Sequence, residues 1–175
     1  DLPGFSRFNL DGPGAAEWLS LQVTGLVPKP GRIGLVYFAD DKGRIVTEMS
    51  VVRHDENLMT LITAAVAQWH DFEWLKSRMP KDAPFKLIDR TEEFSTQILA
   101  GPNSRKILAD VCEADLTLPW LTHQETKIAG RWAKLVRVSF AGELGWEIHT
   151  RIDDTAAIFD AVCAAGQQHG LKPFG

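Results

Sequence analysis

The sequence has 175 residues, of which 45% are hydrophobic, so it can bury a substantial core in one domain or two small ones. Lys and Arg total 19 against 23 Asp and Glu, and the formal charge of -4 without a basic block argues against a nucleic-acid partner. No apolar run approaches the roughly 18 residues that a membrane span requires, and the opening DLPGFSRF lacks the layout of a signal peptide.

The two cysteines, Cys112 and Cys163, are far apart and belong to no C-x-x-C pair. In a chain of this composition they are expected to be buried thiols rather than a disulfide. We therefore expect a protein of the bacterial cytoplasm or the mitochondrial matrix. The final GLKPFG follows a predicted helix without a further element, which indicates a segment of a longer protein.

The first half of the chain alternates strand and helix patterns. FSRFNL alternates as a short strand, and DGPGAAEWLSLQV has a helical apolar face that begins near Pro13. LVYFADDKGRIVTEMSVVRH is predicted to form a hairpin that turns at residues 40–43, and NLMTLITAA a further strand. VAQWHDFEWLKSRM places Val66, Trp69, Phe72 or Glu73, and Leu75 at the spacing of one helix face.

A second unit is predicted to start near Pro84. FKLIDRTEEFSTQILAG contains two strands, PNSRKILADVC a helix, and ETKIAGRWAKLVRVSF a hairpin that turns at residues 129–130. GWEIHT is a further strand, and DDTAAIFDAVCAAGQQHG is an amphipathic helix that ends before Gly170. Because single helices follow strands in no strict βαβ rhythm, the pattern favours an α+β fold with lobes at 1–83 and 84–175.

Glu48 is the first candidate for chemistry, because it interrupts an apolar neighbourhood in the hairpin GRIVTEMSVVRH. Strand alternation places it on one face with Val46 and Ser50. It could be a solvent-facing glutamate on a half-exposed strand. Alternatively, it points into a cleft, where desolvation would suit it to proton handling or to pairing with a cation.

Glu147 is the second candidate, in the stretch VRVSFAGELGWEIHT. The strand pattern breaks at Gly142 and Gly145, which often marks a bulge or a close approach of backbone to ligand. A carboxylate at Glu147 could accept two hydrogen bonds from the edge of one amino-pyrimidine ring. The alternative is a turn glutamate that caps nearby amides.

Other routes to catalysis have little support in the sequence. The five histidines show no metal-ligand spacing, and His70 and Asp71 are neighbours on a predicted helix, where adjacent residues do not face each other. The sequence contains no G-x-S-x-G elbow, no G-x-G-x-x-G fingerprint and no P-loop. A nucleophilic elbow and the usual nucleotide-binding loops are therefore not expected.

Three segments together resemble the glycine-cleavage T-protein (aminomethyltransferase) family. SFAGELGWEIH is similar to the family's S/G-Y-T-G-E-x-G-x-E-I block, ILAGPNSRKIL to its G-P segment, and DKGRIVTEMSV to its G-G-x-x-x-D-x-x-V hairpin. Within the family, GFSRFNLDGPGAAEWL and ITAAVAQWHDFEWL look most like the folate-binding half of dimethylglycine and sarcosine dehydrogenases.

The resemblance implies a fold and its cofactors. The family fold is a three-lobed ring around a central tetrahydrofolate. This chain would supply two mixed α/β lobes, the second ferredoxin-like, while the C-terminal barrel lobe would be absent. A flavin (FAD) domain would precede residue 1 in cis and oxidise a small methylated amine, and this part would receive the one-carbon unit. Neither nucleic acid nor membrane is an expected partner.

The resemblance also assigns site residues. The pterin-gripping glutamate of the family falls on Glu147, and the aromatic position of that block on Phe140, which cannot donate a hydrogen bond as tyrosine would. The catalytic aspartate falls on Glu48, which keeps the carboxylate but extends it by one methylene. Relatives often carry asparagine in a strand that here reads LITAA, so Thr63 and Ala64 are the expected folate contacts at that position.

The implied reaction is the attack of folate N5 on a one-carbon unit, with ring closure to 5,10-methylenetetrahydrofolate. Glu48 would orient the folate and stabilise the developing cation or accept a proton. Two alternatives are a non-catalytic folate-binding module of the same fold, serving iron–sulfur assembly or RNA modification, and a structural remnant that has lost the site.

Overall fold

A computed structural model of the protein describes residues 4–174. The chain divides into two compact units, the first spanning Gly4–Thr91 and the second beginning at Glu92. Each unit has its own sheet and its own hydrophobic core. The two units are described separately below.

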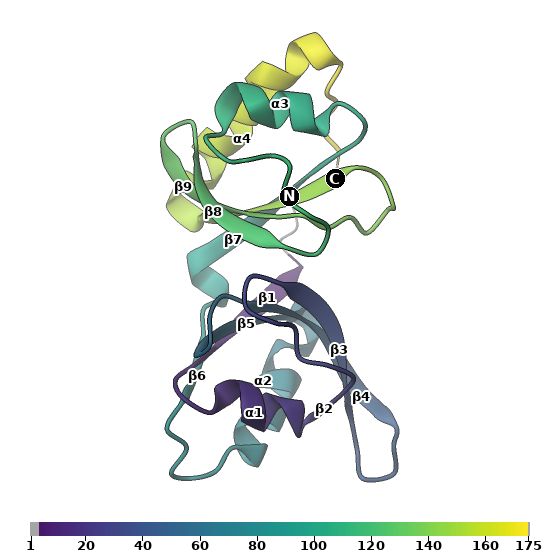
Figure 1. The fold of residues 1–175 in the computed structure, drawn as a ribbon, viewed down its shortest axis with the longest axis vertical. Coiled ribbons are helices and arrows are strands. Elements are labelled where there is room, and N and C mark those ends of the chain that lie inside the picture. The colour runs from purple at the N-terminus through teal and green to yellow at the C-terminus, as the bar shows by residue number, and fades with distance from the viewer. Residues whose placement is uncertain (1–3, 175) are drawn as a thin grey trace. The chain divides into compact units, whose positions relative to one another are not determined.

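The first unit is a six-stranded antiparallel sheet in the order β2-β3-β4-β5-β1-β6, with two helices (Figure 1). Its elements are β1 (Phe5–Asp11), α1 (Ala15–Ser20), β2 (Val23–Thr24), β3 (Ile33–Ala39), β4 (Ile45–Arg53), β5 (Leu58–Ala64), a 3-10 turn (Ala65–Ala67), α2 (Gln68–Arg78) and β6 (Lys86–Asp89).

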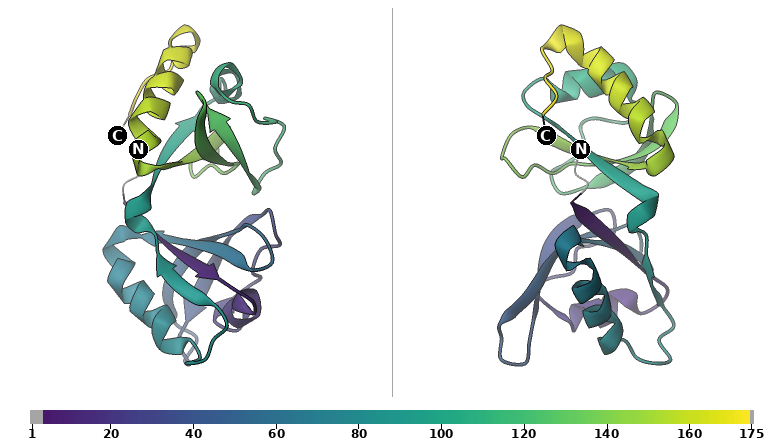
Figure 2. Two further views of the ribbon diagram at one scale, coloured as in Figure 1. Left: turned by 90° about the vertical axis from the view of Figure 1, so that its left-hand side faces the viewer. Right: turned by 180° about the vertical axis from the view of Figure 1, so that it is seen from behind.

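The core of this unit lies between one face of the sheet and both helices (Figure 2). Strand alternation turns Phe8, Val36 and Met49 toward the helices, and all three are fully buried. Helix α2 packs onto the sheet through aromatic contacts: its Phe72 ring lies 5.3 Å from that of Phe8. Burying such side chains removes apolar surface from water and stabilises the unit.

The prediction of which residues of α2 and its preceding turn face the core is partly wrong. Leu75 is fully buried as expected, but Val66 and Trp69 are exposed, at 100% and 72% of their surface. Val66 lies in the 3-10 turn before the helix, whose different twist removes it from the helical pattern. The inward position one turn before Leu75 is occupied by Asp71, which is fully buried.

The second unit is a four-stranded antiparallel sheet in the order β7-β10-β9-β8. Helices α3 and α4 cover one of its faces (Figure 1). Its elements are a 3-10 turn (Thr91–Glu93), β7 (Phe94–Ala100), α3 (Ser104–Val111), β8 (His123–Ile128), β9 (Arg131–Val136), β10 (Gly145–Arg151), a 3-10 turn (Ile152–Asp154), α4 (Thr155–Gly166) and a last 3-10 turn (Gln167–His169).

These units confirm the α+β fold class. The second unit has two helices on one face of four antiparallel strands, as a ferredoxin-like fold does, but its element order β-α-β-β-β-α differs from the β-α-β-β-α-β order of that fold. Neither sheet closes into a barrel within residues 4–174. The unit boundary lies after Thr91 rather than at 83/84, because β6 pairs with β1 and completes the first sheet.

Candidate functional site

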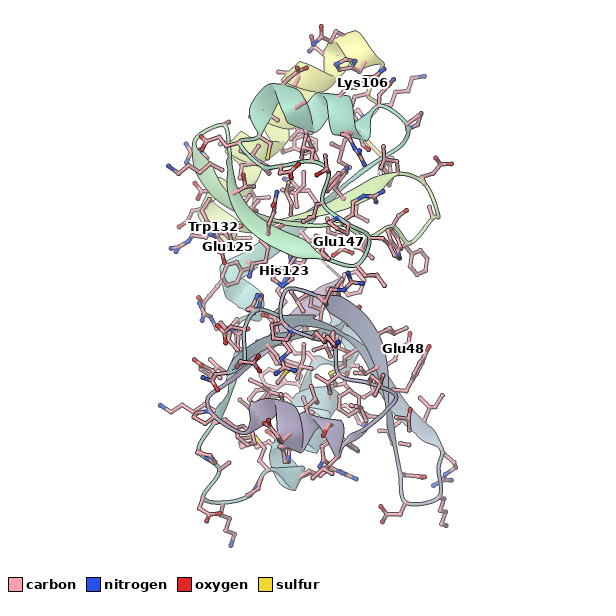
Figure 3. All side chains as sticks on the ribbon, in the orientation of Figure 1. Glu48, Lys106, His123, Glu125, Trp132 and Glu147 are labelled. Atoms are coloured by element: carbon pink, nitrogen blue, oxygen red, sulfur yellow. The ribbon has the colours of Figure 1, made fainter. Side chains whose placement is uncertain are left out.

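Glu147 lies on β10, an inner strand of the second unit's sheet, between Ile98 of β7 and Val136 of β9. Its neighbours Trp146 and Ile148 turn into the helix-covered core, so alternation places Glu147 on the opposite, helix-free face (Figure 3). The Glu147 side chain keeps 26% of its surface exposed. It is therefore half-buried and accessible, as a ligand-binding carboxylate must be.

His149 holds one oxygen of this carboxylate. Its Nε2 lies 2.9 Å from Glu147 Oε2, and its side chain is only 9% exposed. Residues two apart on a strand share a face, which explains why the two side chains meet. No role for His149 is predicted from the sequence, although the alternation that places Glu147 on this face also places His149 there. Because Oε2 is engaged, Oε1 is the oxygen better placed to accept a hydrogen bond from a ligand.

A second charged cluster lies on the same face of this sheet. Lys134, opposite His149 in the strand register, has its Nζ 3.5 Å from Glu125 Oε1, and Trp132 Nε1 donates to Glu125 Oε2 at 3.2 Å. Burial lowers the pKa of Lys134, while attraction to Glu125 opposes that shift. The helix-free face therefore carries two acid–base pairs, Glu147 with His149 and Glu125 with Lys134. Figure 3 labels Glu125, Trp132 and Glu147 on this sheet.

The loop between β9 and β10 is anchored at both ends. Arg137 donates to the carbonyl oxygen of Gly145 at 2.8 Å, and its guanidinium lies 5.4 Å and 5.0 Å from the rings of Trp120 and Trp146. Gly145 is required by close packing, because a Cβ there would lie 2.9 Å from Ser139 Cβ. These contacts fix the start of β10, two residues before Glu147.

Phe140 lies in this loop with its side chain fully exposed, at 104%. Within the second unit the ring has no packing of its own, so it is available for a ligand but is not held in place. Its predicted folate contact stays a prediction.

Glu48 lies on β4 of the first unit, opposite Tyr37 of β3. It is exposed and points away from the helix-covered face, to which its neighbours Thr47 and Met49 belong. Within the first unit this exposure fits the alternative of a solvent-facing glutamate, and the catalytic role of Glu48 stays a prediction.

Thr63 and Ala64 form the end of β5. The Thr63 side chain is buried, and its hydroxyl donates a hydrogen bond to Asp71 Oδ2 on α2. The side chain therefore faces the helices. Ala64 is exposed and leads into the 3-10 turn. A folate contact at this point would therefore use the Ala64 surface or the backbone rather than the Thr63 hydroxyl.

His70 and Asp71 are in contact, contrary to the prediction that neighbours on a helix do not meet. His70 Nδ1 lies 2.8 Å from Asp71 Oδ1, although the two residues are adjacent on α2. The other oxygen of the Asp71 carboxylate accepts hydrogen bonds from the hydroxyls of Thr47 and Thr63. The helical spacing from Asp71 to Leu75 was the signal that the aspartate is buried.

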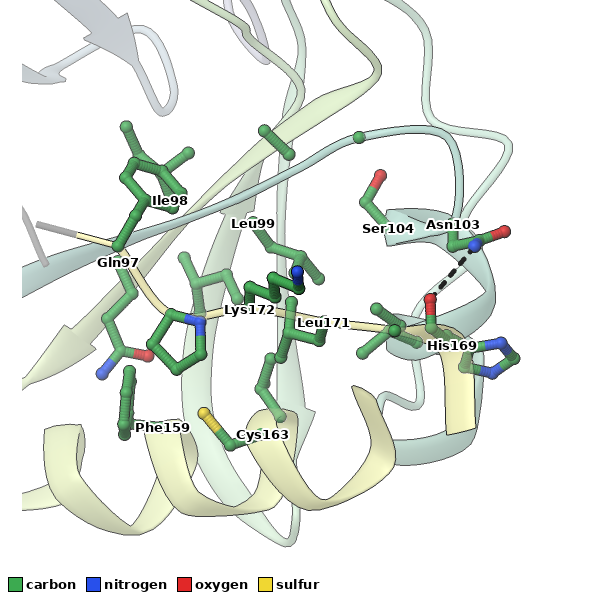
Figure 4. Close-up of a pocket in the computed structure, with 18 of the residues that line it drawn as sticks. Gln97, Ile98, Leu99, Asn103, Ser104, Phe159, Cys163, His169, Leu171 and Lys172 are labelled. Atoms are coloured by element: carbon green, nitrogen blue, oxygen red, sulfur yellow. Dashed lines mark hydrogen bonds between the residues drawn. The ribbon is translucent and has the colours of Figure 1, made fainter. Parts of the chain in front are cut away.

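A cavity of about 350 Å³ lies on the helix-covered side of the second unit, between β7, α3 and α4 (Figure 4). Leu99, Ile148, Phe159 and Leu171 contribute apolar walls. Burial, together with the nearby Asp160, raises the pKa of the lining thiol Cys163, so this thiol stays protonated at neutral pH. Because Ile148 faces this cavity, the adjacent Glu147 points away from it.

Among the residues that the structure describes, no helix is long and apolar enough to span a membrane, and no group of three or more His, Cys, Asp or Glu side chains could hold a metal ion. Cys112 and Cys163 are both free thiols, as expected, but each is half-buried rather than buried.

Comparison with known proteins defines the class to which this fold and face belong. The family model of the GCVT N-terminal domain matches residues 1–175. Dimethylglycine dehydrogenase of Homo sapiens is 31% identical over 181 residues, which cover 100% of this chain and 21% of that protein. An aminomethyltransferase of Natranaerobius thermophilus is 28% identical, over 100% of this chain and 48% of that protein.

Solved structures show the same fold. The glycine cleavage system aminomethyltransferase T from Bartonella henselae superposes with a TM-score of 0.81 at 22% identity, over 93% of this chain and 44% of that chain. A heterotetrameric sarcosine oxidase from Corynebacterium sp. U-96 gives a TM-score of 0.70 at 18% identity, over 98% of this chain and 84% of that chain.

The chain belongs to the GCVT N-terminal domain family. Its likeness to dimethylglycine dehydrogenase and aminomethyltransferase confirms the resemblance drawn from the sequence. The chain spans about a fifth of the dehydrogenase and about half of the aminomethyltransferase. The activities of those whole proteins are therefore proposals for this chain.

Proposed function

We propose that this chain binds tetrahydrofolate and accepts a one-carbon unit from a methylated amine, forming 5,10-methylenetetrahydrofolate. The observation that carries the proposal is the half-buried Glu147 on the helix-free face of β10, with one carboxylate oxygen held by His149. A carboxylate fixed in this way is a good acceptor for the N–H and NH₂ groups on the edge of an aminopterin ring.

In this proposal the hydrogen-bonding edge of the pterin meets Glu147, and the exposed ring of Phe140 packs against the bound ligand. A charge-assisted hydrogen bond is worth more than a neutral one, about 1.5–3 kcal/mol. The arrangement would therefore select a ring that offers adjacent donors over one that does not.

Glu48 would act on the reaction itself. As a carboxylate it can stabilise the cation that develops when folate N5 attacks the one-carbon unit, or accept the proton released on ring closure. Holding both reactants in one site would supply much of the acceleration, because the attack is otherwise bimolecular. The support for this role is the position of Glu48 in a hairpin, DKGRIVTEMSV, that resembles the family's G-G-x-x-x-D-x-x-V hairpin, in a chain that the family model matches.

The proposal also includes the source of the one-carbon unit, a methylated amine that a flavin domain oxidises. Relatives are named dimethylglycine dehydrogenase and sarcosine dehydrogenase, and this chain covers 21% and 13% of two of them. We infer that an FAD domain in cis oxidises the methylated amine in a protein of that kind. The mitochondrial matrix and the bacterial cytoplasm both fit, since those dehydrogenases are called mitochondrial and the aminomethyltransferase is bacterial.

The test is tetrahydrofolate binding measured by calorimetry on the full chain. We expect dissociation constants in the micromolar range, and Glu147→Gln should weaken binding by about 10- to 100-fold because it removes a charged acceptor. Glu113→Gln, an exposed glutamate of the same unit, serves as the matched control and should bind like the wild type. Equal affinity of Glu147→Gln and wild type would remove Glu147 from the site.

A further inference from the structure

The first unit contains a buried carboxylate for which the proposed reaction has no use. Asp71, in the first turn of α2, is fully buried. It accepts hydrogen bonds from the hydroxyls of Thr47, at 3.0 Å, and Thr63, and its other oxygen lies 2.8 Å from His70 Nδ1. A buried carboxylate is costly unless such donors surround it, so these contacts must form together.

Asp71 bridges two strands at the point where their ladder has ended. The register pairs β4 with β5 only from Ser50 opposite Ile62 to Arg53 opposite Met59. Beyond that point β4 continues beside β3 and β5 beside β1. Thr47 and Thr63 lie in these two separated ends, and both hydroxyls reach the same Asp71 oxygen.

The separated ends carry the residues of the proposed site. Glu48 follows Thr47 directly and points to the opposite face of β4, while Ala64 follows Thr63 at the end of β5. Adjacent residues of a strand move together, so the Thr47–Asp71 bond also limits where the Glu48 side chain can be. The Thr63–Asp71 bond limits the backbone at Ala64 in the same way.

We propose that Asp71 is a positioning residue: its carboxylate, held by Thr47 and Thr63, sets the spacing of the β4 and β5 ends and thereby places Glu48 and the Ala64 backbone. The proposal rests on the catalytic role proposed for Glu48. It explains why a charged group occupies the helix–sheet core, where a leucine would otherwise pack. Because about 1 Å of misplacement can cost about 100-fold in rate, a loosened tie should affect turnover more than folate binding.

Thr47→Val tests this link between the strand ends with little change of side-chain shape. It removes the Thr47 hydroxyl and leaves the Asp71 carboxylate with two side-chain partners, Thr63 and His70. Two measurements are made: amide hydrogen exchange over residues 45–49 and 62–65 of this chain without ligand, and steady-state formation of methylenetetrahydrofolate from dimethylglycine or sarcosine by the longer protein, in which the proposed FAD domain oxidises the amine. Thr47→Ser keeps the hydroxyl and is the rescue variant. Thr126→Val removes a strand hydroxyl in the second unit and is the matched control.

We expect Thr47→Val to speed exchange in both segments by about fivefold, because a lost hydrogen bond is worth roughly 1 kcal/mol. The turnover number should fall by about 10- to 100-fold, with the tetrahydrofolate dissociation constant changed less than about threefold. Thr47→Ser should restore both values, and Thr126→Val should leave both unchanged. A purely structural role would not separate turnover from binding or respond to the conservative variant.

Unchanged exchange at residues 62–65 in Thr47→Val would overturn the tie between the strands. Faster exchange with an unchanged turnover number would overturn the positioning of Glu48. If the wild type neither bound tetrahydrofolate nor formed product, the proposed function would fail and the positioning of a catalytic Glu48 would fail with it, whereas the exchange result would still decide whether Asp71 ties the strands. The two failures are thus distinguishable.

Discussion

At the scale of single residues, the Glu147–His149 contact gives the candidate site its orientation. The Nε2–Oε2 distance of 2.9 Å and the low exposure of His149 hold the carboxylate in one rotamer on the helix-free face of β10. Strand alternation predicts that Glu147 and His149 share a face. That they touch depends on rotamers, which a sequence pattern does not encode.

His149→Phe should keep the bulk of this side chain and remove its hydrogen bond to Glu147. We expect tetrahydrofolate affinity to fall by about 2- to 10-fold, the value of one hydrogen bond of roughly 0.5–1.5 kcal/mol. Calorimetry provides the measurement, and His169→Phe, in the last 3-10 turn of the same unit, is the control. An unchanged dissociation constant for His149→Phe would mean that His149 does not orient the carboxylate.

The hydrogen-bonded environment of the buried Asp71 could not be predicted from the sequence. Its position one helical turn before Leu75 predicts an inward side chain, but an aspartate in a core is unusual enough that Val66 and Trp69 were the more obvious inner-face residues. Its donors come from β4 and β5, distant in sequence. Long-range polar contacts of this kind have no periodic signature and become visible only in three dimensions.

At the scale of elements, the β9–β10 connection illustrates how packing explains a glycine. Gly145→Ala would place a Cβ 2.9 Å from Ser139 Cβ and 3.2 Å from the Val138 carbonyl oxygen. We expect it to lower the free energy of unfolding by about 1–3 kcal/mol, as overpacking typically does. Urea unfolding measures this change.

The control for this variant is Gly34→Ala on strand β3, where an added Cβ would meet Pro28 at an ordinary 3.7 Å. Gly34→Ala should leave the unfolding free energy within about 0.5 kcal/mol of the wild type. Equal stability of the two variants would show that the Gly145–Ser139 approach carries no constraint.

The β4–β5 turn provides the pH dependence. Hydrogen bonds from the backbone N–H groups of Asn57 and Leu58 lower the pKa of Asp55 against the opposing effect of its desolvation. The unfolded chain, with the higher pKa, binds the proton more readily. The stabilisation by Asp55 is therefore full above the ordinary value of 3.8 and is lost as pH falls through the lowered pKa.

Asp55→Asn should remove this dependence. We expect the variant to be less stable than the wild type at pH 7, with a difference that shrinks as pH falls below about 4. Thermal unfolding from pH 7 to pH 2.5 measures it, and Asp41→Asn, an exposed residue of the β3–β4 turn, is the control. A difference that stays constant over this range would contradict the assigned cause.

At the scale of the whole molecule, the order of strands and helices and the α+β class could be predicted from periodicity and turn residues. The hairpin turning at residues 129–130, for example, forms as expected, with positive φ at both residues. The boundary between the units could not be predicted, because the pairing of β6 with β1 joins segments more than seventy positions apart. Strand patterns singled out Glu48 and Glu147 as candidates, and the family resemblance added what periodicity lacks, the expected ligand and the expected role of each carboxylate.

The most direct measurement is a crystal structure of the full chain with tetrahydrofolate bound. We predict that the pterin amino and ring N–H groups lie about 2.7–2.9 Å from the Glu147 carboxylate, as charge-assisted hydrogen bonds do. A pterin bound elsewhere, for example in the cavity beneath β7 with Glu147 contacting only solvent and His149, would contradict the proposed site.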